Sequence, residues 1–132
     1  SDVINGGIVD KALQIVKELD MSSSVIFSSF DYRVMEHLNV LDAQMPKALL
    51  YESSQSGELK PSELVKKYEV DVFNCSYRQL TPEWIADLQA HQIPYLVYTV
   101  NEPDLMKELL KKGVSGIFTD FPQELMDIVE NL

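Results

Sequence analysis

The chain has 132 residues, 45% of them hydrophobic and 24% charged, which is the balance of an ordinary globular domain and excludes disordered, collagen-like and disulfide-rich proteins. At this length we expect one domain over residues 1–132 with a single core. The 11 basic and 21 acidic side chains give a formal net charge of −10, so the average field disfavours nucleic acid and anionic lipid surfaces as partners.

The chain opens with an amphipathic helical pattern. Apolar residues at helical spacing form one stripe, and the charged residues of the same segment lie largely on the other side. The stripe comprises Ile8, Ala12, Leu13, Val16 and Leu19. A helix of this kind needs a sheet to cover.

Five short segments rich in β-branched and aromatic residues follow at regular intervals, and each precedes a helical pattern. They are residues 25–27, 48–51, 70–73, 95–100 and 116–119. Their apolar residues are continuous rather than alternating, which is typical of parallel strands covered on both faces. The order is therefore a repeated βα unit after a leading helix.

Capping residues mark where the helices begin and end. Asp31 is placed to cap the helix after the first strand, and Thr81, which precedes a proline, to open a later one. The segment 101–104 is expected to open the next helix in the same way, and Gly113 to close it in a left-handed conformation. Small polar residues between positions 52 and 61 predict a surface loop.

Repeated βα units build either an open doubly wound sheet or a (β/α)8 barrel. Length alone favours the open sheet, because five units complete a flavodoxin-like domain whereas a barrel needs eight strands. The sequence has neither G-x-G-x-x-G after a strand nor G-x-x-x-x-G-K-[ST], so it lacks the glycine cradles that hold dinucleotides and triphosphates. A flavodoxin-like small-ligand binder is kept as one alternative.

Four strand ends carry motifs that belong together. They are Ser28-Ser29-Phe30, Asn74 followed by Leu80-Thr81-Pro82-Glu83, Tyr98-Thr99-Val100-Asn101, and the segment 113–122. In this order they resemble the glycerophosphodiester phosphodiesterase family, whose Trp-Thr-Val-Asn is changed here only at Tyr98. The resemblance runs in register from the first helix to the last.

The resemblance implies an α/β fold that is an incomplete TIM (β/α)8 barrel. This chain would supply about five parallel βα units, the fourth to eighth strands, with a leading helix. Family members hydrolyse glycerophosphodiesters to an alcohol and glycerol 3-phosphate with a divalent metal, Mg or Ca. Their His-Arg pair, Glu-x-Asp metal pair, second His and Glu-x-Lys lie on the first three strands. The resemblance therefore implies the C-terminal half of such an enzyme, which binds no cofactor of its own and is inactive alone.

Residues that mimic those motifs have simpler explanations. His37 and His91 lie in helical patterns without a following arginine, so surface or packing roles are expected. Glu102 and Asp104 fall at a helix start, where acids favour the helix dipole. A Glu-x-Lys at 58–60 lies in the irregular loop. No catalytic residue and no metal ligand is assigned in this chain.

Barrel sites are built at the carboxyl ends of the strands. By analogy with the family, Phe30 and Tyr98 are expected to form an apolar wall against the glycerol or alcohol part of the substrate. Asn101 and Asp120 are expected to orient loops by hydrogen bonding. The structural alternatives are core aromatics for the first pair and helix caps for the second. The same strand ends also carry Ser29, Glu52, Asn74 and Thr99.

A partial barrel leaves two open sheet edges and bares its interior layer of side chains. We therefore expect either a homo-oligomer or association with the missing N-terminal half. A small glycerophosphodiester is the expected partner of the complete enzyme. A noncatalytic half-barrel that serves binding or assembly is the second alternative function.

The single cysteine, Cys75, cannot form an internal disulfide, which favours a reducing, cytoplasmic location. We expect it to be a small buried side chain rather than a reactive thiol. Residues 1–7 have neither the basic start nor the apolar core of a signal peptide. No apolar run approaches the roughly 18 residues of a membrane helix.

Overall fold

Helices and strands alternate along residues 7–132, the part of the chain that this computed structural model describes. The helices are α2 (Ile8–Glu18), α3 (Tyr32–Leu41), α4 (Ser53–Ser56), α5 (Pro61–Tyr68), α6 (Pro82–Ala90), α7 (Pro103–Lys111) and α8 (Pro122–Glu130). The strands are β1 (Phe27–Ser29), β2 (Lys47–Leu50), β3 (Val72–Ser76), β4 (Tyr95–Tyr98) and β5 (Gly116–Ile117). None of these helices is long and apolar enough to cross a membrane. The signal-peptide expectation rests on residues 1–7, of which residues 1–6 lie outside the described part.

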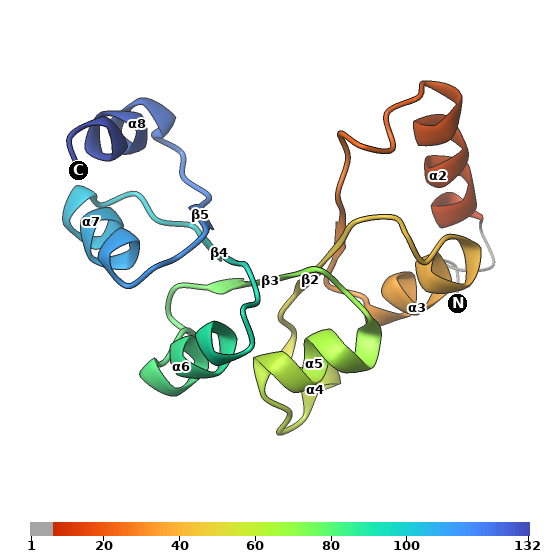
Figure 1. Ribbon diagram of the computed structural model, residues 1–132, viewed down its shortest axis with the longest axis horizontal. Coiled ribbons are helices and arrows are strands. Elements are labelled where there is room, and N and C mark those ends of the chain that lie inside the picture. The colour runs from red at the N-terminus through yellow and green to blue at the C-terminus, as the bar shows by residue number, and fades with distance from the viewer. Residues whose placement is uncertain (1–6) are drawn as a thin grey trace.

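All the strands form one parallel sheet, and each strand pairs with the next in the chain, in the order β1-β2-β3-β4-β5. A doubly wound sheet reverses its strand order at a switch point, so the flavodoxin-like alternative is wrong. The strands lie in a curved row with the helices outside it, and α2 and α8 lie at its two ends (Figure 1). The prediction of an α/β fold with parallel βα units after a leading helix is confirmed.

The strands differ from their predicted bounds, and β3 covers Val72–Ser76 rather than residues 70–73. The first begins at Phe27 rather than at residue 25, because pairing starts where the Phe27 N–H donates to the Pro46 carbonyl at 3.0 Å. The last ends at Ile117, although the Phe118 N–H still donates to the Val97 carbonyl at 2.8 Å. Edge strands have one partner each, so their regular pairing is short.

The core lies between the sheet and the helices. Successive residues of a strand point to opposite faces, so alternate positions of β2, β3 and β4 face the helical layer. Fully buried there are Leu49, Phe73, Cys75 and Val97, with Leu64 and Leu88 from the helices and Met106 from α7. The opposite face of the sheet is the concave one, where a closed barrel would hold its interior.

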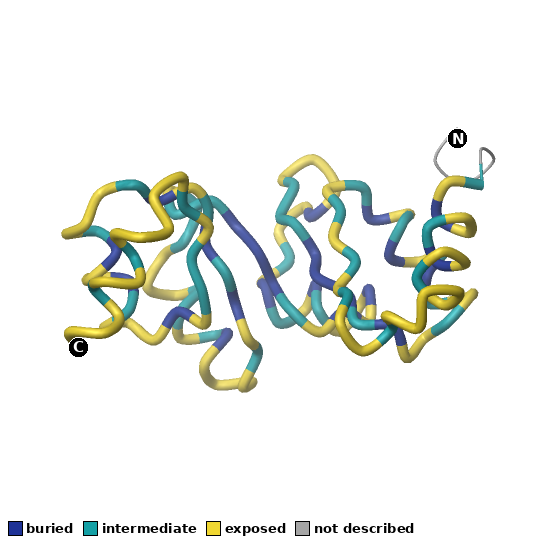
Figure 2. Tube along the Cα trace, turned by 90° about the horizontal axis from the view of Figure 1, so that it is seen from above, coloured by how far each residue is buried: buried dark blue, intermediate teal, exposed yellow. Residues whose placement is uncertain are grey.

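The predicted apolar stripe of α2 is only partly covered. Val9 and Leu13 are buried, whereas Ile8 is 66% and Leu19 63% exposed. The helix lies against α3, to which it is tied by a hydrogen bond between His37 and Asp10. Exposed residues predominate toward both ends of the molecule, and α8 has no buried residue (Figure 2). Two of the five stripe residues are thus exposed, and the helix packs on α3 rather than on the sheet that it was predicted to cover.

Most of the predicted helix caps are confirmed. The Asp31 carboxylate accepts from the Arg33 N–H at 3.1 Å, and the Thr81 hydroxyl from the Trp84 N–H at 3.2 Å. Gly113 directly follows Lys112, the C-cap of α7, and its φ of 92° lies in the left-handed range. The expectation for residues 101–104 is wrong in part, because α7 is capped at Glu102 without a side-chain hydrogen bond. The predicted surface loop at 52–61 contains the short helix α4.

Replacing Gly113 with alanine should lower the free energy of unfolding by about 1 kcal/mol, because a β-carbon is strained at positive φ. A β-carbon there would also lie 2.9 Å from the Gln89 amide nitrogen, which donates to Lys112. Urea denaturation followed by circular dichroism measures the loss. Lys111→Ala, on the exposed surface of the same helix, is the matched control. Equal stability of the two variants would contradict the assignment.

Candidate functional site

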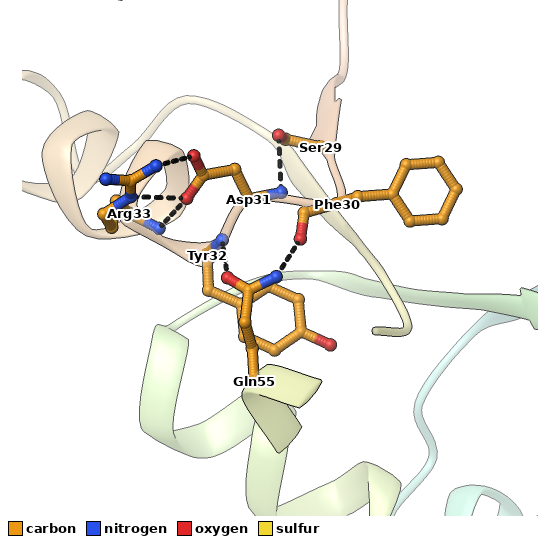
Figure 3. Close-up of polar contacts among 6 residues, drawn as sticks. All are labelled: Ser29, Phe30, Asp31, Tyr32, Arg33 and Gln55. Atoms are coloured by element: carbon orange, nitrogen blue, oxygen red, sulfur yellow. Dashed lines mark hydrogen bonds and ion pairs between the residues drawn. The ribbon is translucent and has the colours of Figure 1, made fainter. Parts of the chain in front are cut away.

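The end of β1 is held by a compact network of polar contacts (Figure 3). Gln55 of α4 accepts from the Tyr32 N–H at 2.9 Å and donates its amide to the Phe30 carbonyl at 2.6 Å. The Arg33 guanidinium donates twice to Asp31, at 2.9 and 2.5 Å, and this hydrogen bonding lowers the pKa of the Asp31 carboxyl. The network fixes the backbone of Phe30 while its ring points away from it (Figure 3).

The end of β2 is joined to the same network through Tyr32. Its hydroxyl accepts from the Glu52 N–H at 2.8 Å and lies 2.8 Å from the Ser56 hydroxyl. Burial is the main cause that raises the pKa of Tyr32. The Glu52 carboxylate is occupied in turn, since it accepts from the Ser54 N–H and hydroxyl at 3.1 and 3.0 Å. Glu52 therefore caps α4 and builds the loop after β2.

Three aromatic rings gather on the concave face of the sheet. The rings of Phe30 and Tyr98 lie 6.2 Å apart and those of Tyr98 and Phe118 6.4 Å apart, both edge to face. Phe30 is 49% and Phe118 47% exposed, so neither is a core aromatic. Partial burial raises the pKa of the Tyr98 hydroxyl, which stays protonated near neutral pH. The rings make an apolar wall at the carboxyl ends of the strands.

This wall borders an open hollow of about 310 Å³. Its lining residues come from all five strands or the turns that follow them: Ser28, Phe30, Leu50, Asn74, Tyr98, Thr99 and Phe118. The structure thus brings Phe30 and Tyr98 together at one hollow. Their contact with substrate stays a prediction.

Asn101 and Asp120 lie together beside this wall and join the ends of β4 and β5. The Asn101 side-chain oxygen accepts from the Asp120 N–H at 3.0 Å and from the Thr119 hydroxyl at 3.2 Å. Its amide nitrogen donates to the Asp120 carboxylate at 3.0 Å. Neither residue is the N-cap of a helix, because α7 and α8 are capped at Glu102 and Phe121. The pair orders two consecutive loops.

Asn74 is a residue to which the sequence analysis gave a place at the strand ends but no role. It is 2% exposed, and its side-chain oxygen Oδ1 has no hydrogen-bond partner among the described residues. Buried polar atoms are paired in the great majority of cases, so this one is an exception that needs a cause. The sequence signal that could have indicated a role for Asn74 is its polar side chain between Phe73 and Cys75 in a largely buried strand.

The residues that resembled family catalytic motifs are spread over the outer surface. His37 bonds to Asp10, and His91 of the α6 C-terminus bonds to Asp87. No group of three or more His, Cys, Asp or Glu side chains in the described part of the chain could hold a metal ion. These residues therefore do not fit the divalent metal that the family resemblance implies.

Cys75 is fully buried in β3, and burial raises the pKa of its thiol to about 12. The thiol is therefore protonated from neutral pH to well above pH 9, whereas only the thiolate attacks alkylating reagents such as iodoacetamide. We expect Cys75 in the folded chain to resist iodoacetamide at pH 8 and to react rapidly in 6 M guanidinium at the same pH. Mass spectrometry of the alkylated chain measures both, and rapid labelling without denaturant would contradict its burial.

Replacing Asn101 with alanine should lower the free energy of unfolding by about 1–2 kcal/mol, because three hydrogen bonds are lost. Asp120→Ala should cost less, since its backbone N–H can still donate to Asn101. Urea denaturation of the two variants compares them. A larger loss for Asp120→Ala would show that Asn101 does not join the two loops.

The model of the glycerophosphoryl diester phosphodiesterase family matches residues 2–124. A glycerophosphodiester phosphodiesterase of Caldanaerobacter subterraneus is 27% identical over 127 residues, which are 96% of this chain and 51% of the relative. One from Bacillus subtilis is 30% identical over 100 residues, which are 74% of this chain and 34% of the relative. The chain spans about half the length, or less, of these curated relatives.

Solved structures show the same coverage. A glycerophosphodiester phosphodiesterase from Parabacteroides distasonis superposes with a TM-score of 0.84 at 26% identity, covering 99% of this chain and 53% of that one. A phosphodiesterase from Oleispira antarctica in complex with the product sn-glycerol-3-phosphate has a TM-score of 0.82 at 16% identity, with 98% and 52% covered. The predicted incomplete TIM barrel, matching about half of such an enzyme, is confirmed. With a family model matched over nearly its whole length, this chain belongs to the glycerophosphoryl diester phosphodiesterase family.

Proposed function

We propose that this chain is the C-terminal, substrate-contacting part of an enzyme that hydrolyses glycerophosphodiesters to an alcohol and glycerol 3-phosphate. The observation that supports it is the family match over residues 2–124, together with an open hollow at the carboxyl ends of the strands. In the reaction a water oxygen loses a proton and bonds to phosphorus, the bond from phosphorus to the alcohol oxygen breaks, and the alcohol oxygen takes up a proton.

This chain's own residues would bind and orient the organic part of the substrate. Phe30 and Tyr98 offer an apolar wall, and Asn101 with Asp120 holds the loops beside it. The described residues offer no paired imidazoles and no cluster of metal ligands. Acid–base catalysis and a divalent metal would therefore come from the part of the barrel that the chain does not span, and the chain alone would be inactive.

A complement of three strands is the partner that this function requires. A closed barrel has eight strands and this sheet has five, so three are needed to join β1 to β5. Two copies of this chain would bring ten strands and a combined formal charge of −20, twice the −10 of one copy. Exposed apolar residues that a partner would cover lie at both ends of the molecule, including Ile8 of α2, Leu19 just after it and Met126 of α8.

A reducing, cytoplasmic compartment is the location that we infer. The only cysteine of the chain, Cys75, is buried in β3 and has no second cysteine with which to form an internal disulfide. Domains stabilised by disulfides are typical of oxidising compartments, and this domain relies on its apolar core instead.

The function is tested by complementation. We expect the purified 132-residue chain to release no glycerol 3-phosphate from glycerophosphodiesters with Mg or Ca present. Mixing it with the part of the Caldanaerobacter relative that it does not match should give a 1:1 complex by native mass spectrometry and metal-dependent release. The two parts of the relative itself, mixed in the same way, are the positive control. Release by the chain alone would overturn the proposed division of roles.

A pair of surface substitutions tests where the complement binds. Met126→Glu places a charge on the surface of α8, where the side chain is 55% exposed, and should weaken the complex at least about tenfold. Val40→Glu, on α3 and 82% exposed, is the matched control and should change nothing. Complex formation without any hydrolysis would favour the alternative of a noncatalytic assembly module.

A further inference from the structure

Asn74 lies in an apolar row on the concave face of the sheet. Its neighbours in β3, Phe73 and Cys75, are both fully buried in the core beneath the helices. Because strand side chains alternate between faces, the Asn74 side chain points to the opposite face. The strand register places it between Leu50 of β2 and Leu96 of β4, which carry no hydrogen-bonding side-chain group.

This row gives the Asn74 amide oxygen no hydrogen-bond partner. That atom, Oδ1, is buried and has no hydrogen-bond partner among the described residues. An apolar residue at this position would remove the desolvation cost of an unpaired amide, so the polar group is not explained by stability. A side chain of this kind in a strand interior is instead placed to meet a group that enters the hollow, of which Asn74 is a lining residue.

The chemistry of the hollow limits what that group can be. None of its lining residues is basic or acidic, so it offers neither a cation for a phosphate nor a carboxylate for an ammonium group. The rings of Phe30, Tyr98 and Phe118 supply an apolar boundary. Ser28, Thr99 and Tyr98 are the lining residues that carry hydroxyl groups. The hollow suits an uncharged, hydroxylated group whose carbon chain can lie against the rings.

We propose that Asn74 is a specificity-determining residue that recognises a hydroxyl group of a neutral polyol in this hollow. A half-turn of the amide exchanges its oxygen and nitrogen, and a hydroxyl can donate to the one or accept from the other. A methylated ammonium group can do neither. The inference rests on the proposed function, in which the polyol is either the glycerol end of the diester or a polyhydroxylated leaving alcohol.

The test is a binding experiment that needs no hydrolysis. The chain, labelled with ¹⁵N, is titrated separately with glycerol, myo-inositol and tetramethylammonium chloride, and the side-chain NH2 signals of Asn74 are followed by NMR. Glycerol tests the glycerol end of the diester and myo-inositol the leaving alcohol. We expect at least one polyol to shift the Asn74 signals and tetramethylammonium to leave them in place. The NH2 of Asn39, which donates to the Tyr68 carbonyl at 2.7 Å outside the hollow, is the internal reference.

A substitution tests whether Asn74 itself binds the polyol or only lies near it. Asn74→Val should weaken polyol binding about five- to tenfold, the effect of losing one or two hydrogen bonds, as measured by the ring signals of Tyr98 and Phe118. Asn131→Val, exposed beyond α8, is the control that should bind as the unaltered chain does. Unmoved Asn74 signals with both polyols, equal shifts with tetramethylammonium, or unchanged affinity in Asn74→Val would each overturn the inference. A chain that binds polyol but never supports hydrolysis would instead contradict the proposed function alone.

Discussion

Parallel pairing between strands that are consecutive in the chain is the constraint on which the rest of this molecule depends. A parallel neighbour can be reached only if the chain returns along the sheet, and here every return is made by a helix on the same side. One face of the sheet is thereby covered from β1 to β5, and the core of Phe73, Cys75 and Val97 forms beneath it. The other face stays concave and open, which puts the polar strand ends on a shared rim.

The helix ends and the repeated unit could be read from the sequence because they follow from local chemistry. Asp31 and Thr81 cap helices by accepting backbone N–H groups a few residues away, and Gly113 adopts the positive φ that other residues avoid. The bounds of β1 could not, because they depend on where Pro46 and Lys47 lie in the next strand. The burial of α2 was also misjudged, since it depends on what covers the helix and not on its own pattern.

For the candidate site, the positions of the residues could be predicted from the sequence, but their contacts could not. Strand-end motifs placed Phe30, Tyr98, Asn101 and Asp120 on one rim, and the structure brings the first two to one hollow and joins the last two by hydrogen bonds. The hydrogen bond of Asn101 with Thr119 could not be foreseen, because a strand-end motif does not show which residue of the next loop faces it. The unpaired side-chain oxygen of Asn74 could not be predicted, because it follows from the register of three strands.

The sequential strand order has a consequence for how the chain folds. Paired residues of neighbouring strands are 20 to 24 positions apart, from Phe27 with Lys47 to Ala48 with Val72, so every chain closure in the sheet is short. Low contact order of this kind is associated with rapid folding, and each βα unit can add to its neighbour as the repeats of a solenoid do. Such a molecule opens from its ends inward, so amide hydrogens of β3 and β4 should outlast those of β1 and β5 in exchange with solvent.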